Sequence, residues 1–397
     1  MSDLAEPAAA STALLVSLSS LPAEAFDQVL RNLAEAFPGE SVTVATPDEL
    51  GSVAETGSAG LLKVVSYMPD TPTANAWTLT AADFVHAHAL AQKHEARAVL
   101  QLGAEAQTLE PAALRGLATA VLEGGIDLAV PRYALPPRAG LVNSAILYPM
   151  TRALYGARPR FPLALDLCLS ARMAERLARF AEKITIANQL DGLVWPVAEA
   201  SVAGFAISEV DAGPRGLPQP AGQDLNTVLA HVTGSLFADV DGKAAFWQRA
   251  RTAPPSRKNG ASWAGSPQAD GEVEMMLESF RLAYVNLHEI WSLVLPPQSL
   301  LGLKRLSALE AGSFLMPDSL WARIVYDFLL AYRLRTINRG HLLGALTPLY
   351  LAWVVSHLVQ TGAGKDPEAH VEAVAAAFEA DKPYLVSRWR WPDRFNP

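Results

Sequence analysis

Asp166 is the acidic residue of this chain with the clearest reason to take part in chemistry. It lies in the apolar run 163–169, LALDLCL, where an ionised side chain is costly unless it has a partner or a task. Arginines precede it, and arginine side chains bind phosphates and carboxylates through paired hydrogen bonds. They are Arg132, Arg138, Arg152, Arg158 and Arg160, of which the last two are also read as ordinary surface residues. The pattern predicts an anion-binding site near one buried carboxylate.

A predicted helix opens at Asn143 and Ser144, between these arginines. The first backbone N–H groups of a helix have no partner inside it and attract anions. Arg152 follows on the same helix. We therefore expect Asn143, Ser144 and Arg152 to bind a small anionic molecule.

Three further acids lie where strands end or helices begin. Asp48 and Glu49 follow the predicted strand 41–45, and there they could accept hydrogen bonds from a ribose or a base. Helix capping or contact with solvent is the alternative for both. Asp191 precedes a predicted helix, so an N-cap is the alternative to a functional role.

Glu105 follows the predicted strand 98–102, after Gly103 and Ala104. A single carboxylate is a weak site for a hard cation unless phosphate or water completes the shell. The residues therefore predict no protein metal site, with Mg²⁺ or Mn²⁺ bound weakly at most.

Predicted strands and helices alternate over the first 240 residues. Strands are expected at 12–18, 41–45, 62–67, 98–102 and 128–131, and helices at 23–37, 80–95 and 111–123. Such alternation predicts an α/β domain with a mostly parallel sheet and helices on both faces, a Rossmann-like arrangement. We assign residues 1–249 to it.

The rest of the chain reads differently. Residues 250–270 are rich in Pro, Gly, Ser and Ala and predict a linker or mobile loop. Beyond it, helices are expected at 271–295, 317–334, 339–360 and 366–380, forming a helical domain over 271–397. The apolar segment 342–358 approaches the length of a membrane span, but Pro348 and its amphipathic neighbours favour a buried helix.

Composition narrows the class of protein. The chain has 397 residues, of which 50% are hydrophobic and 18% charged, so it can build substantial cores. Its net charge of -8 argues against a nucleic-acid-binding protein. Cys168 is the single cysteine, which excludes an internal disulfide and fits a reducing compartment. The first residues lack a basic segment and a long apolar run, so we expect a cytoplasmic protein without a membrane span. Association of identical copies is left open.

The segment 127–175 carries the most specific motifs. It contains Pro131-Arg132-Tyr133, then Asn-Ser-x-x-x-Tyr-Pro-x-Thr-Arg-Ala-Leu-Tyr-Gly from 143 to 156, then Pro-x-x-x-Asp-x-x-x-Ser from 162 to 170. This order resembles the glucosylglycerate and mannosylglycerate (glycosyl-phosphoglycerate) synthase type of glycosyltransferase, which has the GT-A fold. The likeness covers roughly residues 10–250.

The resemblance implies transfer of a hexose from a nucleotide sugar to a small, glycerate-like hydroxyl acceptor. In that scheme Asp166 and Asp191 are the candidate catalytic residues: Asp166 orients the donor sugar, and Asp191 corresponds to an aspartate that opens the following helix. The remaining candidates divide into donor-binding residues Asp48, Glu49, Glu105 and Arg132 and acceptor-binding residues Asn143, Ser144 and Arg152.

The chain departs from this family at the positions that handle metal and diphosphate. Gly103-Ala104-Glu105 stands in place of the Asp-x-Asp, and 208–216 has no histidine, with Asp211 and Arg215 as the nearest candidates. A Gly-Lys-Gly loop is replaced by 77–80, and Ala164 and Leu165 stand where glycines precede the acid.

We therefore expect altered or absent metal dependence. The alternative is a non-catalytic pseudo-glycosyltransferase that binds a nucleotide, a sugar or a partner protein. For Asp166, we expect ligand binding to depend on the carboxylate more than folding does.

Overall fold

The computed structural model describes residues 13–47, 62–69, 77–186, 192–218, 222–250 and 270–392. The chain divides into two compact units. The first comprises Met1–Ala134 and Pro159–Pro220, and the second comprises Leu135–Arg158 and Ala221–Pro397. Residues 135–158 and 221–249 are thus grouped with the helical unit, whereas we expected them in the first domain. The predicted domain boundaries, with the first domain ending at 249 and the helical domain starting at 271, stay predictions. Residues 251–269 of the expected linker lie outside the described residues.

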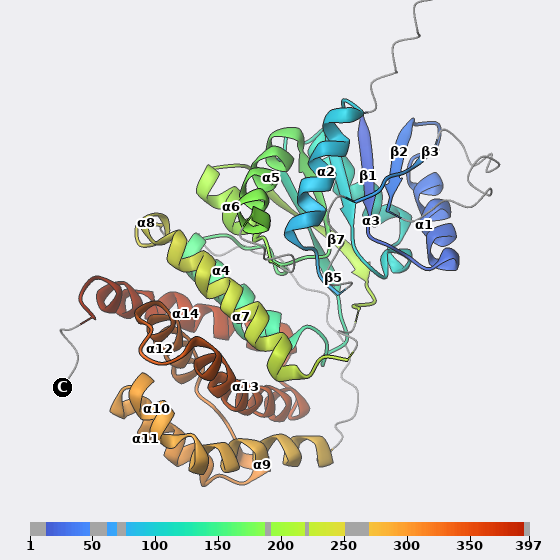
Figure 1. Cartoon of the computed structure of the whole chain (residues 1–397). Coiled ribbons are helices and arrows are strands. Elements are labelled where there is room, and N and C mark those ends of the chain that lie inside the picture. Colours follow the sequence, from blue (N-terminus) through green and yellow to red (C-terminus); the bar gives the residue numbers. More distant parts are fainter. Residues whose placement is uncertain are drawn as a thin grey trace, which may run out of the picture. The chain divides into compact units, whose positions relative to one another are not determined.

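In the first unit, seven strands of the described residues form one sheet in the order β3-β2-β1-β4-β6-β5-β7 (Figure 1). Every neighbouring pair is parallel except the two pairs that β6 makes with β4 and β5. The strands are β1 (Leu14–Leu18), β2 (Val42–Thr46), β3 (Leu62–Ser66), β4 (Ala98–Leu102), β5 (Leu128–Ala134), β6 (Asp166–Ser170) and β7 (Ile207–Pro214).

Helices cover both faces of this sheet, because α1 packs with α3 and α2 packs with α5. The helices of the unit are α1 (Ala23–Ala36), α2 (Ala81–Lys93), the 3₁₀ turn η1 (Ala106–Thr108), α3 (Pro111–Leu122), α5 (Ala171–Ile186) and α6 (Pro196–Ala203). The predicted α/β class with a mostly parallel sheet is confirmed.

Local sequence explains why these elements begin where they do. Thr80 is the N-cap of α2, and Asp83 Oδ2 accepts hydrogen bonds from the Thr80 amide at 2.7 Å and the Thr80 hydroxyl at 2.8 Å. This capping box satisfies backbone groups that a helix start leaves without partners. Pro111 lies in the first turn of α3, where its missing N–H costs nothing. The central strands β1, β2 and β4 are buried along their whole length, as expected for a sheet covered on both faces.

The second unit is helical. Its elements are the π-helical turn η2 (Asn143–Leu147), α4 (Tyr148–Tyr155), α7 (Leu225–Gly242), α8 (Ala244–Trp247), α9 (Asp270–Asn286), α10 (His288–Val294), α11 (Pro297–Ser307), the 3₁₀ turn η3 (Ala311–Ser313), α12 (Asp318–Leu334), α13 (Arg339–Gly362) and α14 (Pro367–Arg390). The helix expected at 271–295 is two helices, α9 and α10. The one expected at 366–380 continues to Arg390 and contains Pro383.

Helix α13 contains the apolar segment noted in the sequence. Among the described residues it is the one helix long and apolar enough to cross a membrane, but most of that apolar stretch is buried inside the protein. Buried residues such as Leu346, Leu349 and Trp353 lie along it. This is the pattern of a core helix.

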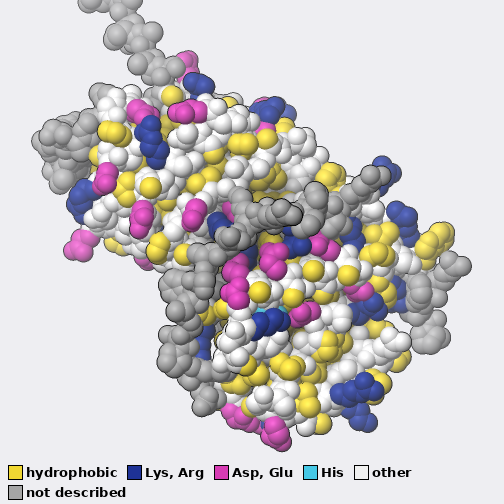
Figure 2. Space-filling model, turned by 180° about the vertical axis from the view of Figure 1, so that it is seen from behind, with side chains coloured by type: hydrophobic (Ala, Val, Ile, Leu, Met, Phe, Trp, Pro, Cys, Tyr) yellow, Lys and Arg dark blue, Asp and Glu magenta, His cyan; other side chains and the backbone are white. Residues whose placement is uncertain are grey.

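Charged side chains are mixed on the surface. On the face shown in Figure 2, Lys and Arg side chains lie scattered among Asp and Glu, and the described residues form no continuous basic area there. This distribution agrees with the net charge of -8.

Asp327 on α12 gives the second unit a testable pH dependence. Its side chain is buried, Oδ1 accepts a 2.6 Å hydrogen bond from the Tyr384 hydroxyl, and Oδ2 has no hydrogen-bond partner in the described part of the chain. Burial raises the pKa of Asp327 to about 7. Because the unfolded chain ionises this acid at much lower pH, the free energy of unfolding should fall as the pH rises toward 7.

Asp327→Asn removes this titration. Between about pH 5 and about pH 8, its free energy of unfolding relative to the wild type should shift by about 2–3 kcal/mol in favour of the variant. Urea unfolding at both pH values measures the shift, and Glu278→Gln, which changes an exposed acid of the same unit, should follow the wild type. Parallel pH profiles for Asp327→Asn and the wild type would show that Asp327 is ionised in the folded protein throughout.

Candidate functional site

The sheet topology defines one edge as the place for a ligand. From β1 the chain moves to β2 and β3 on one side, and β4 lies on the other side of β1. Open α/β sheets bind ligands at such a reversal of strand order, outside the carboxyl ends of the strands. Here β1 is followed by Ser19, which is half-buried, and Ser20, which is exposed. The end of β4 is followed by Gly103–Glu105.

Asp166 lies at this same edge because β6 runs antiparallel. As the first residue of β6 it pairs with Leu102, the last residue of β4. Its side chain is fully buried. Oδ2 accepts a 2.7 Å hydrogen bond from the Tyr133 hydroxyl, and the Gly103 amide lies 3.3 Å from Oδ1. The motif acid is therefore beside the ligand edge but turned into the protein.

Arg215 is the main partner of Asp166. Its Nε lies 2.9 Å from Oδ2 and its Nη2 lies 3.2 Å from Oδ1, and both side chains are 0% exposed. Arg215 follows β7, which pairs with β5 through a register shift between Arg132 and Tyr133. Gly213 adopts a φ of 61° beside this irregularity, a conformation that favours glycine. The bulge lets the chain turn so that Arg215 reaches Asp166.

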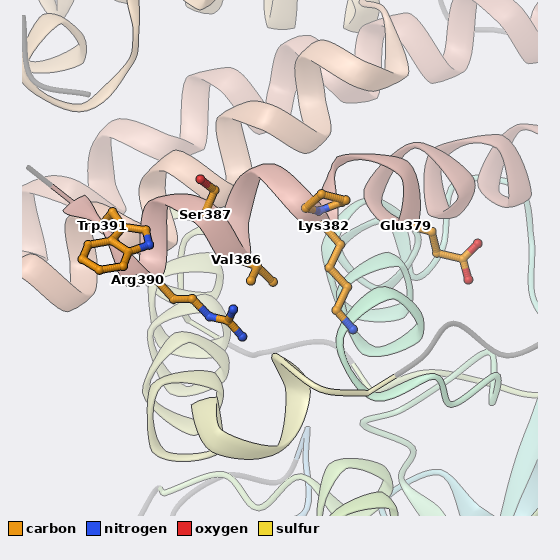
Figure 3. Close-up of a pocket in the computed structure, with 7 residues that line it drawn as sticks. Glu379, Lys382, Val386, Ser387, Arg390 and Trp391 are labelled. Atoms are coloured by element: carbon orange, nitrogen blue, oxygen red, sulfur yellow. The ribbon is translucent and has the colours of Figure 1, made fainter. Parts of the chain in front are cut away.

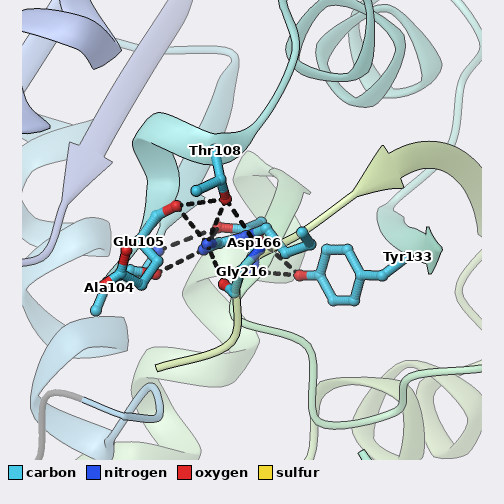
Figure 4. Close-up of polar contacts among 8 residues, drawn as sticks. Ala104, Glu105, Thr108, Tyr133, Asp166 and Gly216 are labelled. Atoms are coloured by element: carbon cyan, nitrogen blue, oxygen red, sulfur yellow. Dashed lines mark hydrogen bonds and ion pairs between the residues drawn. The ribbon is translucent and has the colours of Figure 1, made fainter. Parts of the chain in front are cut away.

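The Arg215 guanidinium lies among six oxygen atoms (Figure 4). Two belong to Asp166. Nη2 also donates to the Ala104 carbonyl at 2.6 Å, and Nη1 donates to the Gly216 carbonyl at 2.7 Å. The others are the Thr108 hydroxyl at 3.1 Å and the Glu105 carbonyl. We call these six atoms the oxygen cage. Through these hydrogen bonds, Arg215 connects the segments that follow β4 and β7 with the start of β6.

Burial and charge set the titration of this cluster. Burial is the largest single effect and lowers the pKa of Arg215, but the charge and hydrogen bonds of Asp166, together with Tyr133 and Glu105, outweigh it, so the pKa is raised. Burial also raises the pKa of Tyr133 well above its usual value, and the nearby Asp166 adds to the effect. Arg215 therefore stays charged, and the Tyr133 hydroxyl stays protonated as a hydrogen-bond donor.

The structure places the other predicted donor-binding residues as follows. The Glu105 side chain is exposed and accepts a 2.7 Å hydrogen bond from Gln107. Its backbone has a φ of 62°, uncommon for a residue other than glycine and frequent at functional sites. Arg132 on β5 is half-buried, with Nη1 3.8 Å from Glu209 Oε1. Asp48, Glu49 and Asp191 lie outside the described residues, so their roles stay predictions.

The predicted acceptor-binding residues belong to the second unit, and one expectation about them is wrong. The helix begins two residues earlier than predicted, at 141, and the Ser144 amide donates to the Gly140 carbonyl at 3.1 Å. It is therefore not a free helix-start amide. Asn143 and Ser144 are both buried.

Arg152 is held by two carboxylates of α14. Nε and Nη2 lie 2.9 and 3.0 Å from the two oxygens of Glu379, and Nη1 lies 2.6 Å from Glu372. Nη1 also lies 3.3 Å from the Tyr148 hydroxyl. Burial lowers the pKa of Arg152, but its bonds to Glu379 and its other partners more than compensate and raise it. Arg152 thus joins α4 to α14.

The residues at the ligand edge do not fit a divalent metal. Among the described residues, no group of three or more His, Cys, Asp or Glu side chains is placed to hold one. Both oxygens of Asp166 already face Arg215. A side-chain carbon added at Gly103 would lie 3.1 Å from the Leu165 carbonyl and from its Cβ. An acid at 103 would therefore require Leu165 to shift.

The second unit has a cavity of its own along α14 (Figure 3). It measures about 460 Å³ and is lined by Glu379, Lys382, Pro383, Val386, Ser387, Arg390 and Trp391. Lys382 donates a 2.8 Å hydrogen bond to the Ala250 carbonyl, and burial lowers its pKa to about 8. We assign this cavity no ligand.

Sequence analysis did not predict the roles that Arg215 and Tyr133 have at this edge. Tyr133 lies in the Pro-Arg-Tyr motif, and Arg215 was named, with Asp211, as a nearest candidate for the place of the missing histidine. The available signal was a complementary pair: a lone acid in one apolar strand, and an arginine between Pro214 and Gly216 at the end of another. Buried charges are paired far more often than not.

Comparison with known proteins finds only distant likeness. No family model matches the chain, and no curated protein matches it. Similar solved structures include glucosyl-3-phosphoglycerate synthase from Mycobacterium tuberculosis in complex with Mn²⁺, UDP and glucosyl-3-phosphoglycerate, at 17% identity and a TM-score of 0.38, covering 62% of this chain and 82% of that one. Another, described as a mycobacterial protein, has 16% identity and a TM-score of 0.37, covering 66% and 82% of the two chains. We therefore base the proposals below on this chain's own residues.

Proposed function

We propose that the first unit is a nucleotide-sugar-binding domain of glycosyltransferase type that works without a divalent metal. One observation carries the proposal: Asp166, the acid of the Pro-x-x-x-Asp-x-x-x-Ser motif, lies at the carboxyl edge of the sheet beside the end of β4. The reversal of strand order between β1 and β4 marks this edge for a ligand. The motif and the topology, which are independent signals, therefore point to one place.

In this proposal the buried pair and the exposed residues have separate tasks. Asp166 and Arg215 are fully buried, so they position the strand ends and do not touch the donor. Glu105, Ser19 and Ser20 are accessible polar residues at the edge, suited to hydrogen bonds with ribose or sugar hydroxyls. Asp48, Glu49 and Arg132 remain the other residues predicted to bind the donor, and Asp191 remains a predicted catalytic residue.

The reaction we propose is transfer of a hexose to a small hydroxyl acceptor of anionic, glycerate-like character in the cytoplasm. Asn143 and Ser144 remain the residues predicted to contact the acceptor. Arg152 would have to exchange its bonds with Glu372 and Glu379 to do so.

A second candidate is a non-catalytic pseudo-glycosyltransferase that binds a nucleotide, a sugar or a partner protein. Its support is the charge at the edge. Arg215 is neutralised by Asp166, and Glu105 adds a carboxylate nearby, so these three residues together carry net negative charge and would repel a diphosphate. This charge opposes a reaction that must hold and release a diphosphate, and it therefore favours a protein that binds a sugar or a partner without transfer.

A thermal-shift panel of nucleotide-diphosphate sugars, each with Mg²⁺ or with EDTA, tests the proposal. One member at a hundred times its dissociation constant should stabilise the protein by about 2.7 kcal/mol, to a similar extent in both conditions. The matched control is the corresponding free sugar at the same concentration, which should give no shift.

The outcomes separate the two candidates. A shift together with sugar transfer to a hydroxy acid supports the enzyme, and a shift without transfer to any acceptor supports the binding protein. If no nucleotide sugar changes the melting temperature, the proposed function is wrong. Loss of tenfold or more in affinity with EDTA would mean that a metal is bound by residues not named above.

A further inference from the structure

The oxygen cage is a donor set that suits a cation. All six atoms facing Arg215 are oxygens, from three backbone carbonyls, one hydroxyl and one carboxylate. Carboxylates, backbone carbonyls and hydroxyls are the groups that hard divalent cations take as ligands in proteins. The surroundings of Arg215 thus resemble a cation site more than an ordinary surface ion pair.

The position of the cage adds to this argument. Its members come from the segment after β4, the start of β6 and the segment after β7, which meet at the ligand edge. Asp127 shows the contrast within the same unit. Its partner Arg172 donates to both Asp127 oxygens but is 64% exposed, so that guanidinium faces solvent, whereas Arg215 is enclosed by buried oxygens.

We infer that the Arg215 guanidinium is the built-in cation of this edge, filling the oxygen cage and excluding divalent cations from it. The positive charge, which a bound ion would otherwise supply, is covalently part of the chain. The edge therefore keeps its shape at any metal concentration. The inference rests on these side chains alone and holds whether or not the unit binds a nucleotide sugar.

Removing the guanidinium should turn the cage into a weak divalent-cation site. In Arg215→Ala, the melting temperature should fall by about 10 °C, because the Asp166 charge loses its partner. Millimolar Mn²⁺ or Ca²⁺ should then restore about 3 °C or more, while K⁺ should not. The wild-type melting temperature should be the same in Mn²⁺, Ca²⁺ and EDTA.

Two further variants keep the test decisive if Arg215→Ala does not fold. Arg215→Lys retains the charge, so it should fold with a lowered melting temperature and gain nothing from divalent cations. The double variant Asp166→Asn/Arg215→Gln has neither charge and should also be insensitive to them. Arg172→Ala is the matched control, because it frees the Asp127 carboxylate without exposing an oxygen cage.

Three results would overturn the inference. Stabilisation of the wild type by Mn²⁺ or Ca²⁺ at this edge would show that Arg215 does not exclude them. A folded Arg215→Ala that ignores divalent cations would show that the cage is no cation site. Equal rescue of Arg172→Ala and Arg215→Ala would show that any unpaired carboxylate responds in the same way.

Discussion

Asp166→Asn is expected to destabilise the protein by about 3–5 kcal/mol, the cost of leaving one member of a buried ion pair without its partner. The substitution removes the charge that neutralises Arg215 and replaces one acceptor oxygen by an N–H donor. That donor would face the guanidinium or the Gly103 amide, which are donors themselves. Urea unfolding followed by circular dichroism measures the loss.

The matched control is Asp27→Asn on α1, the same chemical change at an exposed position, which should alter stability by about 0.5 kcal/mol or less. Near-wild-type stability of Asp166→Asn would contradict the structural role. It would instead support the expectation from the sequence, that this carboxylate matters more to ligand binding than to folding.

The sequence predicted the burial of Asp166 correctly but not its partner. The apolar run around Asp166 correctly indicates a buried carboxylate that needs a partner. The partner, Arg215, is 49 residues away and directly follows β7. It is brought to Asp166 by the antiparallel insertion of β6 and the bulge opposite Tyr133. Neither feature has a local signature that fixes which side chains meet.

The fold was more predictable because its main signals are local. Alternating apolar strands and amphipathic helices predicted β1 to β5 and α1 to α3 within a few residues. No separate strand was predicted at β6, because LDLCL has no alternation to distinguish a strand from any other buried run.

The start of the helix that carries the predicted acceptor-binding residues was also located imprecisely from the sequence. Asn143 and Ser144 are good N-cap residue types, and they predicted a helix start. The helix instead begins before them, so that the Ser144 amide bonds to Gly140. A difference of two residues removes the predicted anion site at that amide, because only the first turn has free N–H groups.

Arg152→Met is the second variant with a large expected effect, a loss of about 2–4 kcal/mol in the free energy of unfolding. The arginine side chain is 8% exposed and makes hydrogen bonds to Glu379, Glu372 and Tyr148. Methionine fills similar volume but leaves the partly buried Glu379 without a counter-ion. Arg179→Met is the control, because Arg179 is 73% exposed in an i,i+4 pair and such pairs contribute about 0.5 kcal/mol or less.

The same variant distinguishes the two roles suggested for Arg152. If it joins α4 to α14, Arg152→Met loses stability, and Glu379→Gln loses a comparable amount because it breaks the same pair from the other side. If it binds an anionic acceptor, melting stays normal and the stabilisation of the wild type by a ligand such as 3-phosphoglycerate disappears in Arg152→Met. Because Arg152 makes four hydrogen bonds to acidic or phenolic oxygens of its own unit, we expect the first result.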